Sequence, residues 1–296
     1  MIILFSKISI LMMAMLTSIV FFSKTWYEIF ILSEINMLCF LFIMWIYNFK
    51  KSMELVMTYL LLQSISTIMF FTLMFNMSNY SIEMMNLLLL IMILKMGMFP
   101  FMFWMLNLMK NMNSKLFIML MTFQKIIPLK MLFLLMENSN FKNNTIFMIY
   151  LMVFSIMFFS FVGFFNKNIY STMFYSSLHF MSFYMLVMVF SQKYNLFFII
   201  SYMLYFMFFM SMLNNNMLEL SNYNKNFSKN GFFLNMMIYM GFPPMMLFFV
   251  KFILLLLIYK YLSFFFTFLI IISFILMMKL YLNIILWKYY TLMNMK

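Results

Sequence analysis

The 296-residue chain contains no arginine and no aspartate, and it is poor in charge of either sign. Charged residues occupy 8% of its positions, whereas about a quarter of the residues of a typical soluble domain are charged. Hydrophobic residues occupy 67% of the positions. Water would not solvate a surface with so few charges. The composition therefore excludes a water-soluble globular domain and favours a membrane protein.

Cysteine, histidine and glycine are too scarce for several kinds of cofactor site. Cys39 is the single cysteine and His179 the single histidine, which excludes an internal disulfide, a thiolate cluster for iron and sulfur, and a histidine pair for haem. The four glycines form no glycine-rich nucleotide loop. We therefore expect this chain to bind no redox cofactor and no metal.

The abundant residue types indicate a coding bias. The chain has 45 methionines, 45 phenylalanines and one alanine, and all nineteen basic residues are lysines. Leucine would serve a lipid-facing surface as well as methionine, and arginine would serve a membrane surface as well as lysine. Codons rich in A and T, read with a code in which ATA specifies methionine, explain this usage. The composition therefore predicts an AT-rich animal mitochondrial genome as the source.

Apolar runs recur along the whole chain, each near or above the roughly 20 residues that cross a hydrocarbon core. They predict an all-α, polytopic bundle of about ten transmembrane helices, organised as a single membrane domain over residues 1–296. The first run lacks the character of a transit peptide, so we interpret it as a transmembrane helix. The predicted spans are 3–22, 26–46, 53–75, 84–109, 116–136, 145–165, 170–190, 196–213, 231–259 and 263–287.

Lysines between the spans predict the orientation of the chain. A net charge of +13 would suggest nucleic acid in a soluble protein, but here the lysines flank apolar runs and are typical of membrane-surface anchors. Nine lysines fall on the side of both termini and four on the other side, which predicts both termini in the mitochondrial matrix. Long side chains that reach the interface explain Lys7, Lys110, Lys130, Lys260 and Lys288.

Four ionisable residues lie too deep in the predicted spans for that explanation: Glu34, Lys95, Lys125 and Lys251. A charge at the bilayer centre costs at least about 2.5 kcal/mol, so such residues normally face the bundle interior and mark ion or proton routes. Burial disfavours a charged amine and a nearby carboxylate favours it. Movement of a carboxylate relative to a lysine would therefore load or release a proton.

Glycine and proline cluster near three of these residues. Proline removes a backbone donor, which is tolerated at membrane depth only where protein or a water-filled cavity satisfies the freed groups. Transporters build midplane sites from such broken helices, so the pattern predicts two of them; a kink for packing alone is the alternative. Gly97 and Pro100 follow Lys95, Pro128 follows Lys125, and Gly241, Pro243 and Pro244 precede Lys251.

His179 is a candidate proton relay between the deep charges. Its reference pKa of about 6.5 suits that role. A single histidine beside Ser176 and Ser177 is equally well explained as a hydrogen-bonded packing residue. For Lys279 the sequence favours an interior position and an interfacial position equally.

Four strings at these positions, in this order, resemble one family: SEINMLCFLF, LKMGMFPFMFW, TFQKIIPLKML and MGFPPMMLFFVKF. Together they are similar to the chain 2 family of mitochondrial NADH:ubiquinone oxidoreductase, the respiratory complex I, over about residues 26–287. The resemblance implies an antiporter-like, proton-translocating subunit of the membrane arm in the mitochondrial inner membrane. It implies a part in a proton-translocating NADH:ubiquinone reductase without redox chemistry in this chain.

The resemblance also implies partners and residue roles. Other membrane-arm subunits, including neighbouring antiporter-like chains, and lipids would surround the chain, while NADH, FMN, iron–sulfur clusters and ubiquinone would bind elsewhere in the complex. Glu34 resembles the family's glutamate, Lys95 its partner lysine, Lys125 its central lysine and Lys251 the lysine of its second broken helix. His179 is displaced by one position from the family's histidine.

Two other functions are compatible with the same residues. A cation/proton antiporter subunit of the related bacterial type would use the same buried lysine and glutamate, although the coding bias argues against it. A structural subunit without its own proton path would contain buried charges that merely pair.

Overall fold

The computed structural model describes residues 2–47, 52–75, 82–137, 145–166, 169–190 and 246–293. Within these ranges the chain forms helices and no strand, which confirms the all-α prediction. The chain divides into two compact units, Met1–Met148 and Ile149–Lys296, and each is described by itself. That they act as a single membrane domain stays a prediction.

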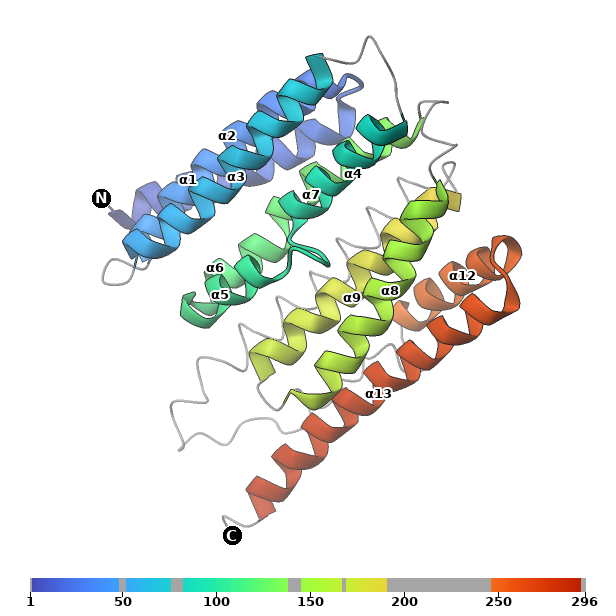
Figure 1. Ribbon diagram of the computed structural model, residues 1–296. Coiled ribbons are helices and arrows are strands. Elements are labelled where there is room, and N and C mark those ends of the chain that lie inside the picture. Colours follow the sequence, from blue (N-terminus) through green and yellow to red (C-terminus); the bar gives the residue numbers. More distant parts are fainter. Residues whose placement is uncertain are drawn as a thin grey trace. The chain divides into compact units, whose positions relative to one another are not determined.

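In the first unit, α2 occupies a central position. It contacts α1, α3, α6 and α7, and Figure 1 shows α1, α2 and α3 running side by side. In turn, α7 contacts α1 and α4 as well as α2. The helices are α1 (Ile2–Phe22), α2 (Trp26–Tyr47), α3 (Ser52–Phe75), α4 (Ile82–Met96), α5 (Phe103–Asn111), α6 (Ser114–Met121) and α7 (Phe123–Glu137).

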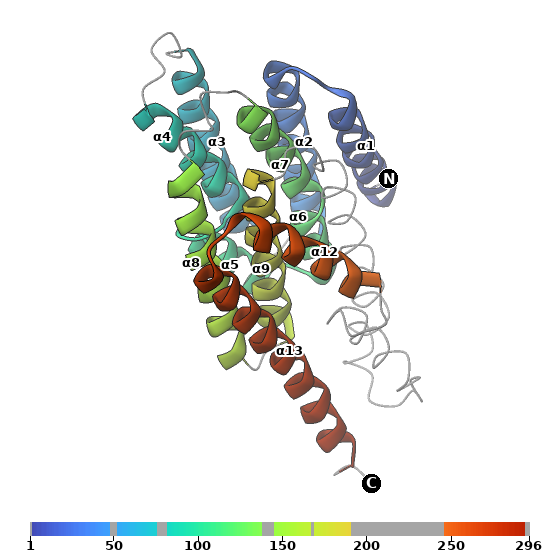
Figure 2. The same ribbon diagram turned by 90° about the vertical axis from the view of Figure 1, so that its right-hand side faces the viewer.

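The second unit is built around α9. Its helices are α8 (Thr145–Phe165, which begins at the end of the first unit), α9 (Ile169–Phe190), α12 (Met246–Tyr261) and α13 (Phe264–Met293). The helices α9, α12 and α13 contact one another, and they can be followed in Figure 2. Within the second unit, α9 thus contacts both α12 and α13.

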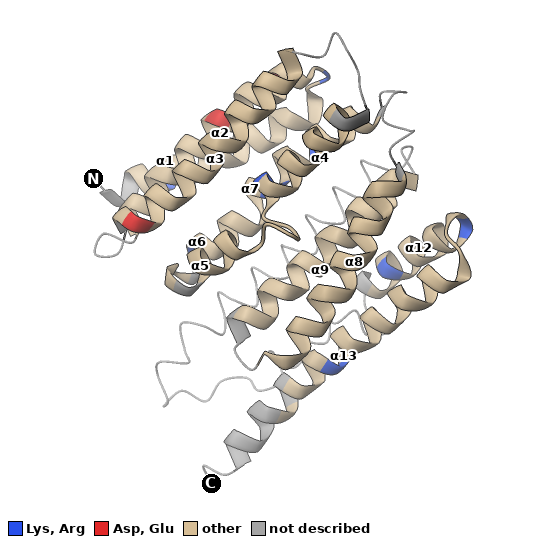
Figure 3. Ribbon diagram, in the orientation of Figure 1, with Lys and Arg blue, Asp and Glu red and all other residues tan. Residues whose placement is uncertain are grey.

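Seven helical stretches of the described residues are long and apolar enough to cross a membrane. In lipid every backbone polar group needs an internal partner, which a helix provides. In Figure 3, few positions on these helices are coloured as basic or acidic residues. The chain is therefore a multi-pass membrane protein. The predicted span 196–213 and the predicted break at Gly241, Pro243 and Pro244 lie outside the described residues, and span 231–259 is described only from Met246.

The predicted break after Lys95 is present. Helix α4 ends at Met96, and Gly97 follows in the left-handed region with φ of 62°. The Gly97 N–H bonds to the Leu94 carbonyl at 3.0 Å and the Met98 N–H to the Ile93 carbonyl at 3.1 Å, as in a Schellman motif. The Phe99–Pro100 peptide bond is cis, and α5 resumes at Phe103. Glycine is thus the residue that terminates α4.

A second discontinuity lies just before Lys125, at a residue that carries no glycine or proline signal. Thr122 separates α6 from α7, with φ of −99° and ψ of −83°. Its backbone N–H and its hydroxyl both bond to the Ile118 carbonyl, at 2.9 Å each. Pro128 lies inside α7 instead of ending it. Because proline has no N–H, the α7 ladder lacks its bond to the Gln124 carbonyl.

Replacing Gly97 by alanine tests the first break. A Cβ atom there would lie 3.0 Å from Met105 Cε and 3.0 Å from Trp104 Cζ2, in a backbone conformation that also disfavours L-residues. We expect G97A to lower the free energy of unfolding in lipid micelles by about 1–2 kcal/mol.

The matched control is G163A. Gly163 is inside α8, with a helical φ, and a Cβ would lie 3.1 Å from the flexible end of Leu280 and 3.3 Å from Tyr175 Cβ. We expect a change below about 1 kcal/mol, because alanine also raises helix propensity. Equal tolerance of both variants would contradict the assigned role of Gly97.

Candidate functional site

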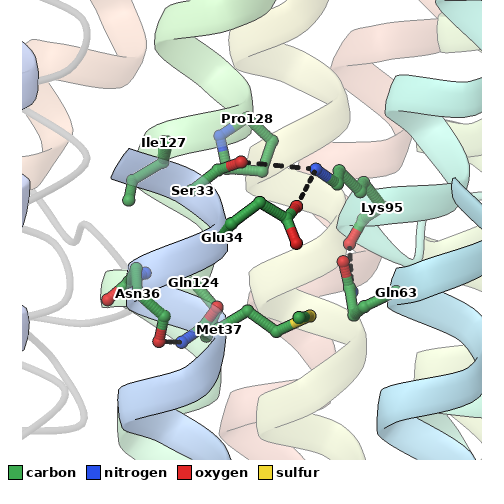
Figure 4. Close-up of a pocket in the computed structure, with 9 residues that line it drawn as sticks. All are labelled: Ser33, Glu34, Asn36, Met37, Gln63, Lys95, Gln124, Ile127 and Pro128. Atoms are coloured by element: carbon green, nitrogen blue, oxygen red, sulfur yellow. Dashed lines mark hydrogen bonds and ion pairs between the residues drawn. The ribbon is translucent and has the colours of Figure 1, made fainter. Parts of the chain in front are cut away.

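An ion pair joins α2 and α4 in the first unit. Glu34 lies in α2 and Lys95 in the last turn of α4. Lys95 Nζ is 3.8 Å from Glu34 Oε1, and the side chains are 5% and 31% exposed, respectively. Figure 4 shows the two groups pointing toward one another. The last turn of a helix is also the end at which its dipole attracts a positive charge.

Polar and aromatic groups of α2 and α3 complete the surroundings of Lys95. Its ammonium donates to Ser33 Oγ at 3.5 Å and lies 5.6 Å from the centroid of the Phe30 ring. Gln63 Nε2 donates to the Lys95 carbonyl at 3.2 Å. That carbonyl belongs to the last turn of α4, where the helix ladder supplies no donor, so Gln63 satisfies a group that the break releases.

A small cavity lies beside the ion pair. Its volume is about 20 Å³, enough for a single water molecule. The carboxylate therefore borders a space, lined in part by polar groups, that could hold a water molecule. The cavity is lined by Ser33, Glu34, Asn36, Met37, Gln63, Lys95, Gln124, Ile127 and Pro128 (Figure 4).

Three hydrogen bonds tie the start of α7 to α2 and α3. Asn36 Nδ2 donates to the Phe123 carbonyl at 3.4 Å, and Gln124 Nε2 donates back to the Asn36 carbonyl at 3.2 Å. The Tyr59 hydroxyl donates to Gln124 Oε1 at 2.9 Å. Asn36 and Tyr59 are each 1% exposed. We call the side chains of Asn36, Tyr59 and Gln124 the amide clamp.

Lys125 follows the amide clamp and lies in the first turn of α7. Its side chain is 1% exposed, and its Nζ makes no hydrogen bond with any residue that the structure describes. A charged ammonium without a partner in an apolar interior is strongly unfavourable, whereas a neutral amine costs less. This position suits a group that changes its protonation state.

Lys251 occupies an aromatic environment in the second unit. It projects from α12 with 8% of its surface exposed. Its Nζ lies 4.6 Å from the centroid of the Phe180 ring of α9 and 5.9 Å from that of Phe274 of α13. Faces of aromatic rings attract a cation, by about 2 kcal/mol when the contact is desolvated.

His179 lies next to the same aromatic rings. Its ring centroid is 5.2 Å from that of Phe274, and its Nε2 is 3.1 Å from Ser273 Oγ. The single hydrogen of that hydroxyl is donated to the Ile270 carbonyl at 2.6 Å. His179 Nε2–H is therefore assigned as the donor to Ser273, which leaves a lone pair on Nδ1 of the neutral ring. Within the described ranges, Nδ1 has no hydrogen-bond partner.

Comparison with known proteins links this chain to solved structures only. No protein-family model matches the sequence, and no curated protein sequence matches it. A chain of the respiratory complex I from Thermus thermophilus with bound aureothin superposes with a TM-score of 0.73 at 15% identity, covering 94% of this chain and 68% of that one.

A second match comes from the membrane-bound sulfane sulfur reductase, an archaeal respiratory membrane complex. One of its chains superposes with a TM-score of 0.71 at 15% identity, covering 89% of this chain and 62% of that one. The chain has the fold of chains from respiratory membrane complexes. At this identity the likeness concerns the fold, and the present chain spans about two thirds of the length of each neighbour.

The structure brings together some of the residues that the sequence singled out. Glu34 and Lys95 form a pair, while Lys125 is buried in the same unit without an ionic partner in the described residues. Lys251 and His179 share aromatic neighbours in the other unit. His179 bonds to α13, whereas the hydroxyls of Ser176 and Ser177 bond to carbonyls of their own helix.

Lys130 and Lys279 differ in their burial. Lys130, for which the sequence favoured an interfacial position, is only 7% exposed, and its Nζ lies 4.8 Å from the centroid of the Phe133 ring. Lys279 is exposed, with its Nζ 5.5 Å from the centroid of the Phe164 ring. Among the described residues, no three histidine, cysteine or acidic side chains lie together as metal ligands would.

The predictions made from the sequence did not include the residues of the amide clamp or Gln63. A signal existed, because Asn36, Gln63 and Gln124 are amides within apolar spans, where an unsatisfied polar group costs several kcal/mol. Sequence separation hid the partners, since Asn36 lies 87 and 88 positions from the residues that it bonds.

A pair of variants tests the ion pair. K95M leaves Glu34 without its cation, so we expect the free energy of unfolding to fall by about 1–3 kcal/mol, less than for a fully buried pair because Glu34 is partly exposed. In the double variant E34Q/K95M both charges are absent, and we expect stability within about 1 kcal/mol of wild type. Both variants are measured by unfolding in lipid micelles. A double variant less stable than K95M would contradict the pairing.

Proposed function

We propose that this chain is a proton-translocating, antiporter-like subunit of the membrane arm of mitochondrial NADH:ubiquinone oxidoreductase. The fold shared with a chain of a respiratory complex I supports the kind of complex. The four strings around the buried charges support the chain 2 family. The coding bias supports the mitochondrial inner membrane, and the distribution of lysines between the spans supports both termini in the matrix. Other membrane-arm subunits would be its partners, and the redox cofactors would bind elsewhere.

The observation that carries the proposal is the contrast between two buried lysines of one unit. Lys95 is held 3.8 Å from the carboxylate of Glu34, whereas the described residues offer no hydrogen-bond partner to Lys125. The same amine is thus stabilised as a cation at one position and left without compensation at the other. In the proposed function, Lys95 would hold a proton, and Lys125 would accept that proton and pass it on.

In the proposed mechanism, Glu34 controls the charge of Lys95. While the carboxylate is near, an ammonium at Lys95 is favoured; when the carboxylate moves away or takes up a proton, that support is lost. The proton released from Lys95 nitrogen would pass through transient water to the amine of Lys125, which becomes an ammonium. Return of the Glu34 carboxylate would restore the first state once Lys95 has taken up a new proton from water and Lys125 has passed its proton on.

The second unit supplies further proton-holding groups. The ring faces of Phe180 and Phe274 stabilise a cationic Lys251, and the lone pair on His179 Nδ1 accepts a proton without breaking the bond to Ser273. Lys251 and His179 are therefore proposed as the later proton sites of this chain. Both are buried, so movement of a proton between them would require transient water.

The test is K125M in the assembled complex. Methionine has a similar length but accepts no proton, so we expect fewer protons moved per electron in vesicles, with normal assembly. K260M is the matched control, because Lys260 is an exposed lysine in the last turn of α12. An unchanged proton-to-electron ratio in K125M would refute the proposed role. Sodium-stimulated proton flux without an electron donor would favour the cation/proton antiporter.

A further inference from the structure

The first turn of α7 is weakly held by its own helix. Thr122 interrupts the helix before this turn, and Pro128 removes the ladder bond to the Gln124 carbonyl after it. Lys125 lies between these two defects. Its position therefore depends on bonds that come from other helices.

The amide clamp supplies such bonds. Asn36 and residues 123–124 exchange two hydrogen bonds, one in each direction, and Tyr59 holds the acceptor oxygen of the Gln124 side chain. Each clamp residue comes from a different helix, α2, α3 or α7. Loss of the Gln124 amide would break two of the three bonds at once, whereas loss of the Tyr59 hydroxyl would break one.

The clamp residues Asn36 and Gln124 are also close in sequence to the two charged sites. Asn36 follows Glu34 by two residues on α2, and Gln124 directly precedes Lys125 on α7. Asn36 and Gln124 both line the cavity beside the ion pair, as Figure 4 shows. A displacement of the Glu34 turn would pull on the Asn36 carbonyl and hence on the turn that carries Lys125.

We infer that Asn36, Tyr59 and Gln124 are positioning residues that couple the Glu34–Lys95 ion pair to Lys125. The inference rests on the proposed function, because coupling matters only if the two sites exchange a proton. Tyr59 acts through Gln124, since its hydroxyl bonds to that side chain. The clamp touches neither the Lys95 ammonium nor the Lys125 amine through any bond found among the described residues.

The test compares Y59F, Q124M and Y59F/Q124M in the assembled complex, with protons moved per electron as the readout. We expect Q124M to fall at least halfway from the wild-type ratio to that of K125M, and Y59F to fall less. The double variant should match Q124M, because Tyr59 acts through Gln124. Y27F is the matched control, since Tyr27 is an exposed tyrosine of α2. A purely structural role would lower assembly and leave the ratio of assembled complexes unchanged.

The outcomes separate the two proposals. A wild-type ratio in Q124M together with a lowered ratio in K125M would overturn the clamp and leave the proposed function standing. A wild-type ratio in K125M would overturn the proposed function itself. If Q124M does not assemble, Y59F decides alone, because it removes one hydroxyl and keeps the ring that packs against Phe40 at 5.2 Å between centroids. A wild-type ratio in Y59F would then overturn the clamp.

Discussion

The cost of an uncompensated charge or polar group in an apolar interior governs the construction of this chain. In the first unit, several departures from a simple apolar helix are matched by a partner. The cation at Lys95 faces the carboxylate of Glu34, and the carbonyl released at the end of α4 accepts from Gln63. The broken start of α7 is held by Asn36. Lys125 departs from this pattern within the described residues, and this is why we propose it as a functional group.

Three buried lysines show three ways to place the same amine in a membrane bundle. Lys95 uses a carboxylate, Lys251 uses the faces of two aromatic rings, and Lys125 has no hydrogen-bond partner among the residues described. These environments differ in how strongly they stabilise a positive charge. A proton that moves among them would meet sites of unequal affinity, which a change in position of Glu34 could reorder.

Much of the fold followed from the sequence, because apolar runs of membrane length have few alternatives. The break at Gly97 was predictable, since a glycine followed three residues later by a proline indicates the end of a helix. The break at Thr122 was not predictable from the sequence, because threonine carries no such signal. The bond that Asn36 donates to the Phe123 carbonyl beside this break joins residues 87 positions apart. Depth along a span marked Glu34 and Lys95, and the resemblance implied that they are partners. Their 3.8 Å contact depends on α3 and α7, which each contact both α2 and α4. Lys130 was misjudged because depth along a helix does not reveal which face is buried.

The central claim is that the amine of Lys125 changes its protonation state during turnover. Infrared difference spectroscopy on the assembled complex, with and without ¹⁵N-labelled lysine, measures this directly. The account predicts a lysine N–H deformation band that appears on turnover, shifts with the ¹⁵N label and is missing from K125M. A turnover difference spectrum without any label-sensitive lysine band, or with the same band in K125M, would contradict it.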